Sequence, residues 1–149
     1  MLLSDRFRGH DLSLFFEHIF HLGKEAGLVF GHVKILSNSR LALMASEYAR
    51  DQGHYDAFHE NIFHAYFTEG LEIGKVDVIA AVARKSGLDE KEIIRVVHDG
   101  RYAVRLNDAK KEGELLGLTG IPLFIINNKH QITGTQAIET FRKFIDKIQ

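Results

Sequence analysis

The sequence contains nine histidines, a side chain that can bind metals or transfer protons. His18 and His21 lie three residues apart on a predicted helix, and Glu17 precedes the first of them. Two side chains can meet one ion, but a protein zinc site needs three or four ligands. Other histidines recur every five residues, which turns successive side chains by about 140° around a helix; these are His54, His59 and His64. We therefore interpret the histidines as surface residues, and we expect no metal site and no cofactor.

The sequence also offers no convincing nucleophile. It has no cysteine, which excludes thiol catalysis, disulfide bonds and thiolate metal ligands by these residues. Ser37 and Ser39 are typical helix caps, and Ser4 lies on no strained strand-to-helix elbow. Glu60 and His64 are four residues apart, a spacing that predicts a weak pair on a helix surface rather than a catalytic dyad.

The stretch from Leu118 to Thr135 predicts a short β-hairpin, with the only proline of the sequence at its entrance. A proline fixes its φ angle and donates no hydrogen bond, so Pro122 suits the first position of a strand. The residues at 123–126 are all apolar, as in a strand that is covered on both faces. Asparagines at 127 and 128 favour a tight turn, and residues 130–133 can form the second strand. A final helix is expected after Thr135, which could cap it.

The rest of the chain has the apolar spacing of amphipathic helices that end at glycines. Asp11 is expected to cap the first of them, and short apolar pieces without a clear class follow at 28–36. The predicted helices cover about 12–26, 40–52, 54–68, 76–86, 90–98, 102–116 and 136–148. Most of the chain is therefore expected to be helical, and only two strands are predicted.

Composition sets further limits. The chain has 149 residues, of which 45% are hydrophobic and 26% charged, the balance of an ordinary globular protein. A net charge of −1 does not favour binding to nucleic acid or to an anionic membrane surface. The start lacks the apolar core of a signal peptide, and no apolar run approaches the roughly 20 residues of a membrane span. We therefore expect a cytoplasmic protein with neither nucleic-acid nor membrane partners.

The hairpin and several upstream stretches resemble the DsbA family, in its FrnE-like branch of thiol–disulfide oxidoreductases. The C-terminal resemblance lies in Thr119-Gly120-Ile121-Pro122-Leu123-Phe124 and in Thr133-Gly134-Thr135-Gln136. The upstream resemblance lies in Asn38-Ser39-Arg40-Leu41-Ala42, Tyr48-Ala49-Arg50-Asp51-Gln52-Gly53 and Phe63-His64-Ala65-Tyr66-Phe67-Thr68-Glu69-Gly70. In that family a thioredoxin fold carries an inserted helical domain.

The resemblance implies a fold and a domain organisation. The fold class is α/β, an incomplete thioredoxin-like (DsbA-like) fold that consists mostly of the helical insert, with a C-terminal β-hairpin and helix. Residues 1–149 would form a single DsbA-like domain, with the insert at about 37–100 and the thioredoxin-like portion at about 101–149. The family's opening βαβ unit, which carries the Cys-x-x-Cys motif, is not found in this sequence.

The resemblance also implies a site. The family proline that matches Pro122 is cis and faces the redox-active cysteines, and the residue before it offers backbone groups to an extended peptide or to glutathione. Thr119, Gly120, Ile121 and Pro122 are therefore the expected substrate-binding residues, with a peptide or a thiol as ligand. Without cysteines the chain cannot perform the family's reaction, because thiol–disulfide exchange needs a thiolate.

Two other interpretations of the function remain open. The glutathione-dependent isomerase branch, exemplified by 2-hydroxychromene-2-carboxylate isomerase, shares the fold, and its catalytic serine also lies in the opening unit. Alternatively, the chain is a non-catalytic binding or assembly module. A two-stranded hairpin has unpaired edges and is marginally stable alone. We therefore expect a homodimer that forms through the bare sheet edge.

Overall fold

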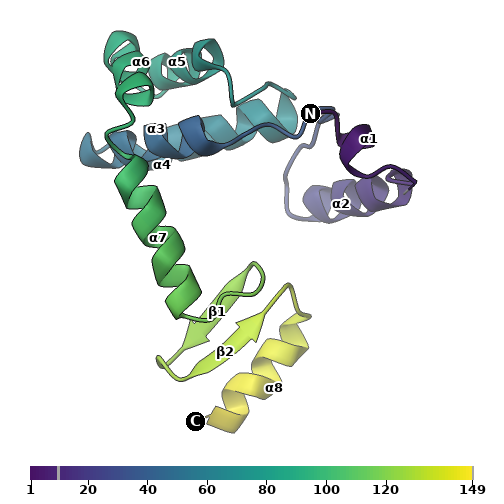
Figure 1. Ribbon diagram of the computed structural model, residues 1–149. Coiled ribbons are helices and arrows are strands. Elements are labelled where there is room, and N and C mark those ends of the chain that lie inside the picture. The colour runs from purple at the N-terminus through teal and green to yellow at the C-terminus, as the bar shows by residue number, and fades with distance from the viewer. Residues whose placement is uncertain (10, 149) are drawn as a thin grey trace. The chain divides into compact units, whose positions relative to one another are not determined.

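The computed structural model describes residues 1–9 and 11–148. The chain divides into two compact units, Met1–Leu106 and Asn107–Gln149. The first unit is helical, and the second contains the two strands and the last helix (Figure 1). The predicted architecture, mostly helical with a C-terminal hairpin and helix, is confirmed. None of the described helices is long and apolar enough to cross a membrane.

Four helices build the core of the first unit: α3 (Arg40–Asp51), α4 (Tyr55–Phe63), α5 (Val76–Lys85) and α6 (Glu90–Asp99). Helices α3 and α5 each pack against the other three. Alanines and aliphatic side chains at helical spacing fill the interior, and the largest fully buried side chains are Phe58, Ile79, Ile93 and Val96.

The N-terminal part of this unit contains α1 (Leu3–Arg6), α2 (Ser13–Glu25) and an extended segment at 28–36. An isolated antiparallel bridge joins Leu2 to Ile35, which lies in the segment to which the sequence assigned no clear class. The prediction that Asp11 caps α2 is wrong. The helix begins at Ser13, and its N-cap residue is Leu12, which makes no side-chain hydrogen bond. Asp11 instead accepts hydrogen bonds from the backbone N–H and the hydroxyl of Ser13, at 2.9 and 2.6 Å.

The helix predicted over 54–68 changes its winding in its second half. After α4 the chain forms a π-helix, η1 (His64–Thr68), in which the N–H of Glu69 bonds to the carbonyl of His64 at 3.0 Å. The wider turn also changes a side-chain pair. His64 contacts Glu69, with Nδ1 and Oε1 3.1 Å apart, whereas the sequence predicted a pair with Glu60.

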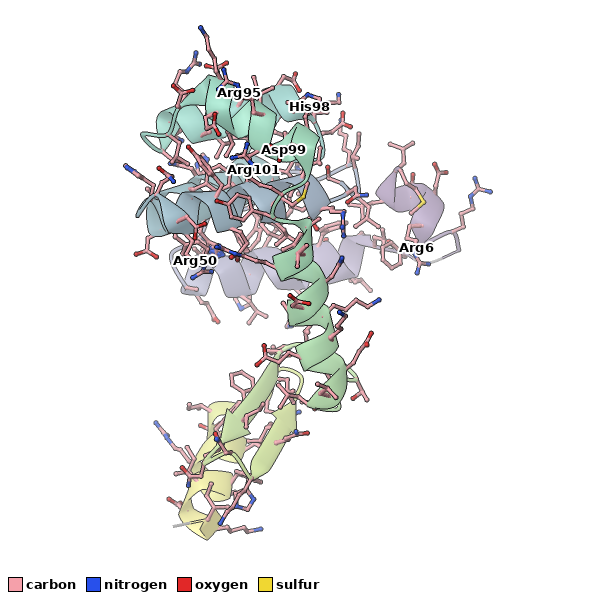
Figure 2. The ribbon with its side chains drawn as sticks, turned by 60° about the vertical axis from the view of Figure 1, so that its left-hand side comes forward. Arg6, Arg50, Arg95, His98, Asp99 and Arg101 are labelled. Atoms are coloured by element: carbon pink, nitrogen blue, oxygen red, sulfur yellow. The ribbon has the colours of Figure 1, made fainter. Side chains whose placement is uncertain are left out.

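Polar contacts fix the start of α7 (Ala103–Leu115) on the helical core. Arg105 donates two hydrogen bonds to the carboxylate of Asp51 in α3, at 2.8 and 2.9 Å, and the hydroxyl of Tyr102 adds a third at 2.8 Å. These donors lower the pKa of Asp51 below its ordinary value, the bonds from Arg105 having the larger effect. Figure 2 shows Asp99 and Arg101 side by side just before α7, where Arg101 Nε donates to Asp99 at 2.8 Å.

The second unit consists of the end of α7, the hairpin and α8. Strand β1 (Leu123–Ile126) pairs with β2 (His130–Thr133) in antiparallel register, with Leu123 opposite Thr133. Helix α8 (Ile138–Ile148) packs on the hairpin through two pairs of rings, Phe124 with Phe141 and His130 with Phe144, whose centroids lie 4.8 and 5.8 Å apart. Among the described residues of this unit none is fully buried.

Substitutions on the buried and exposed sides of α4 test whether the core stabilises the helical unit. We expect Phe58→Ala to lower the free energy of unfolding by about 3–5 kcal/mol, because Phe58 is fully buried and its removal leaves a cavity. Phe63→Ala, on the same helix but 52% exposed, should cost about 1 kcal/mol or less. Urea unfolding followed by far-UV circular dichroism measures both values. Equal losses in the two variants would show that the core does not lie where this structure places it.

Candidate functional site

The four predicted site residues lie together in the loop that leads into β1. Thr119, Ile121 and Pro122 are exposed, and the side chain of Ile121 is 83% accessible. The peptide bond between Ile121 and Pro122 is cis, the isomer that the family resemblance implies. Gly120 lies close to β2, because a Cβ atom at this position would come within 3.3 Å of the methyl group of Thr133. The loop therefore presents a large apolar side chain to solvent beside the first strand.

The register of the hairpin determines which backbone groups of β1 are free. Opposite residues in an antiparallel pair alternate between hydrogen-bonded and non-hydrogen-bonded positions. The N–H of Gly134 donates to the carbonyl of Pro122 at 2.8 Å, which marks that pair as hydrogen-bonded. Two residues further along, Phe124 lies opposite Ile132 at the next hydrogen-bonded position.

Leu123 and Ile125 therefore occupy the alternate positions, and they direct their N–H and C=O groups away from β2. Within the described part of the chain no other backbone group pairs with them. The outer edge of β1 thus offers two donors and two acceptors in the geometry that an added strand requires.

Side chains distinguish this edge from the opposite one. Strand β1 is apolar throughout and uncharged, whereas β2 carries Gln131 and Thr133 and follows Lys129. Polar and charged residues protect exposed edges from unwanted pairing, and β1 lacks them. Gln131 is itself engaged, since its amide donates to the carbonyl of Leu116 at 3.0 Å. We therefore take the edge of β1 and the loop at 119–122 together as the candidate site, and call it the β1 edge.

The turn fixes this arrangement. Asn127 and Asn128 both have φ of 53°, a left-handed conformation that asparagine tolerates better than most residues. The N–H of Lys129 bonds to the carbonyl of Ile126 at 3.2 Å and closes the turn. The pairing register, and with it the outward direction of Leu123 and Ile125, follows from this closure.

The histidines form no metal site among the described residues, since no group of three or more metal-binding side chains converges there. His21 contacts Glu25 at 3.3 Å rather than sharing a site with His18. His54 is exposed, as predicted, whereas His59 is half-buried. His54 Nδ1 lies 3.0 Å from the carbonyl oxygen of Ser86, and the ring of His59 lies 5.3 Å from that of Tyr55.

Comparison with known proteins identifies the family. A DSBA-like thioredoxin domain matches residues 10–146, which is nearly the whole chain. The chain belongs to the DSBA-like thioredoxin domain family. Its fold is also similar to that of a probable DsbA oxidoreductase from Streptomyces coelicolor, with a TM-score of 0.76 and 19% sequence identity over 90% of this chain.

The similarity covers only part of the length of the relatives. The chain spans 58% of the length of the Streptomyces coelicolor protein. It is 26% identical to the uncharacterized protein YwbO of Bacillus subtilis over 110 residues, which are 73% of this chain and 54% of that protein. The chain therefore spans little more than half the length of the relatives that it matches.

The DsbA-like family is defined around a thioredoxin domain, yet these 149 residues contain no cysteine. The exchange of thiols with disulfides proceeds by attack of a thiolate on a disulfide sulfur, so the residues of this chain cannot carry it out by themselves. The β1 edge exposes backbone hydrogen-bonding groups together with the apolar side chains of Ile121 and Ile125.

Sequence reasoning found the loop and the hairpin but missed a second feature, a hollow beside η1. Tyr55, His59, Phe63 and Phe67 recur every four residues, a spacing that places rings along one side of a helix. That spacing is visible in the sequence. It does not predict a hollow by itself, because the exposure of Phe63 and Phe67 depends on the tertiary packing.

Proposed function

We propose that these residues act as the polypeptide-binding portion of a DsbA-like thiol–disulfide oxidoreductase system, in which cysteines outside residues 1–149 perform the redox step. The β1 edge would receive an extended segment as an added strand. The observation that carries this proposal is the pair of outward-facing residues in β1, Leu123 and Ile125, whose backbone groups have no partner among the described residues.

The strength of such binding follows from the number of groups that take part. Two residues with free N–H and C=O groups can form up to four backbone hydrogen bonds with an incoming strand. Each contributes about 0.5–1.5 kcal/mol net, because the same groups bond to water when unbound. Apolar contact adds to this sum, and the exposed side chains of Ile121 and Ile125 lie where the added strand would run. Family membership supports the same site, since strand addition is a recurring mode of peptide recognition.

A proline substitution tests this proposal, because it removes a single N–H. Ile125→Pro deletes an outward donor without breaking a bond to β2, and proline is tolerated at an edge strand. We expect it to weaken the binding of a fluorescein-labelled Thr-Val-Thr-Val-Thr peptide by about 5-fold, the effect of losing one hydrogen bond with its neighbouring contacts. Fluorescence anisotropy measures the affinity.

Thr133→Pro is the matched control, because Thr133 also occupies a non-hydrogen-bonded position but faces the other edge of the hairpin. Its affinity for the peptide should equal that of the unchanged protein. An equal loss in both variants would show that the outward N–H of Ile125 makes no specific contact with the peptide, and no loss in Ile125→Pro would place the peptide elsewhere. Either result would refute the β1 edge as the binding site.

A second candidate function is assembly with a second copy of the chain through the same edge. Two β1 strands can pair in antiparallel fashion about a two-fold axis at Phe124, which places Leu123 of one copy opposite Ile125 of the other. Both are outward-facing residues, so this register forms four hydrogen bonds. The incomplete burial of the second unit favours this candidate, since Ile125 remains 40% exposed.

If the chain self-associates through β1, its mass in solution should depend on the side chain at position 125. Light scattering of the purified chain at micromolar concentration should give the mass of a dimer, and Ile125→Lys should return it to a monomer by placing like charges at the shared edge. Leu115→Lys, which changes a more exposed residue of the same unit, should leave the dimer intact. A monomeric mass for the unchanged chain would exclude this candidate and would leave peptide binding untouched.

A further inference from the structure

The helical unit contains a hollow of about 500 Å³ that lies between the segment at 27–30 and the helices α4 and η1. This volume falls in the range of small-molecule sites. The hollow belongs entirely to the unit Met1–Leu106, so it is independent of the β1 edge and of the function proposed for it.

Hydrogen bonds that involve the backbone hold the two sides of the hollow together. The N–H of Gly31 donates to the carbonyl of Phe67 at 2.8 Å, and the hydroxyl of Thr68 donates to the carbonyl of Val29 at 2.7 Å. Gly31 also approaches the carbonyl of Thr68 so closely that a Cβ atom could not be accommodated. The extended segment is thus held against η1, and π-helical turns of this kind occur frequently at functional sites.

The walls are mainly aromatic. Phe30 and Phe67 meet edge to face with ring centroids 5.9 Å apart, and the ring of Phe63 lies 5.6 Å from that of Phe67. Phe63 is 52% exposed and Phe67 is 37% exposed, although both lie next to the well-packed core. Three rings around one hollow provide the contact area that a flat aromatic molecule requires.

The charged groups around the hollow indicate whether an aromatic ligand should be neutral or charged. Glu60 lines the hollow, and its carboxylate forms no ion pair with any described residue. His59 and His64 also line the hollow, and Nδ1 of His64 lies 3.1 Å from Oε1 of Glu69. The faces of aromatic rings carry negative partial charge and attract cations. The aromatic rings and the carboxylate of Glu60 therefore both favour a positively charged ligand.

We propose that this hollow binds a small planar aromatic cation, which the rings of Phe30, Phe63 and Phe67 contact and the carboxylate of Glu60 attracts. The ligand lies against the π-helix and the segment at 27–30, and its positive charge is near Glu60 in the last turn of α4. This proposal names a chemical class only, and the β1 edge takes no part in it.

The probe is N-methylquinolinium, with uncharged quinoline as its near-isosteric partner. In isothermal titration calorimetry of the full chain we expect saturable binding with one site, and about 3-fold tighter binding of the cation than of quinoline, the size of an exposed cation–π and carboxylate contribution. In ¹⁵N-resolved NMR spectra, the shifted amides should be confined to residues 27–31 and 59–69.

Two variants separate the contributions of rings and charge. Phe63→Ala should weaken both compounds at least 5-fold because it removes a wall, whereas Glu60→Gln should weaken only the cation and make the two affinities equal. Leu14→Ala, a change at an exposed residue of α2 outside the hollow, is the matched control and should change neither affinity.

Three results would overturn the proposal. The absence of saturable N-methylquinolinium binding below millimolar concentration would remove the site itself. Unchanged binding in Phe63→Ala would place the ligand elsewhere. Quinoline binding as tight as that of the cation, with Glu60→Gln without effect, would show that charge plays no part in the hollow.

Discussion

The account depends on the direction in which two residues of β1 point their backbone groups. The hydrogen bond from Gly134 to Pro122 and the register with β2 place Leu123 and Ile125 outward. Backbone donors and acceptors that lack a partner are strong determinants of where a protein binds, because pairing them costs little once the strand is already ordered. The exposed loop at 119–122 leads directly into this edge, so an exposed apolar side chain and unpaired backbone groups occur next to each other.

The two units of the chain differ in how they are stabilised. The helical unit has a continuous core in which buried alanines of α3 and α5 belong to the same cluster as Phe58 of α4 and Ile93 of α6. The hairpin and α8 have no comparable interior among the described residues, and their contacts are a few ring pairs on one face. A two-stranded hairpin of this size gains stability when further strands or layers cover it. Binding at the β1 edge and stabilisation of the second unit would therefore be the same event.

The sequence was sufficient for the hairpin because several local signals agree there. Pro122 marks the entrance, the asparagines at 127 and 128 supply the turn, and four apolar residues separate them. The order of the helices likewise follows from apolar spacing and from glycines such as Gly100, which ends α6 with φ of 67°. The outward direction of Leu123 and Ile125 could not be predicted, since it depends on the pairing register rather than on residue type.

Other features depend on tertiary contacts. The π-helix at His64–Thr68 has no signature in residue type, and it arises where the segment around Gly31 docks on the helix through Phe67 and Thr68. The shift of His64 from Glu60 to Glu69 is its direct consequence. Asp11 was interpreted as a helix cap, and it does accept hydrogen bonds from Ser13, but the helix starts later than the cap pattern predicted.

Amide hydrogen exchange of the hairpin tests the central claim most directly. For the chain alone, without added peptide and at a concentration where light scattering gives a monomer, the amides of Leu123 and Ile125 should exchange rapidly, while those of Phe124 and Ile126 are protected by β2. An added strand should slow the exchange of the first pair and leave the second pair unchanged. Protection of Leu123 and Ile125 in the unbound monomer would mean that the edge already has a partner, and it would contradict the account.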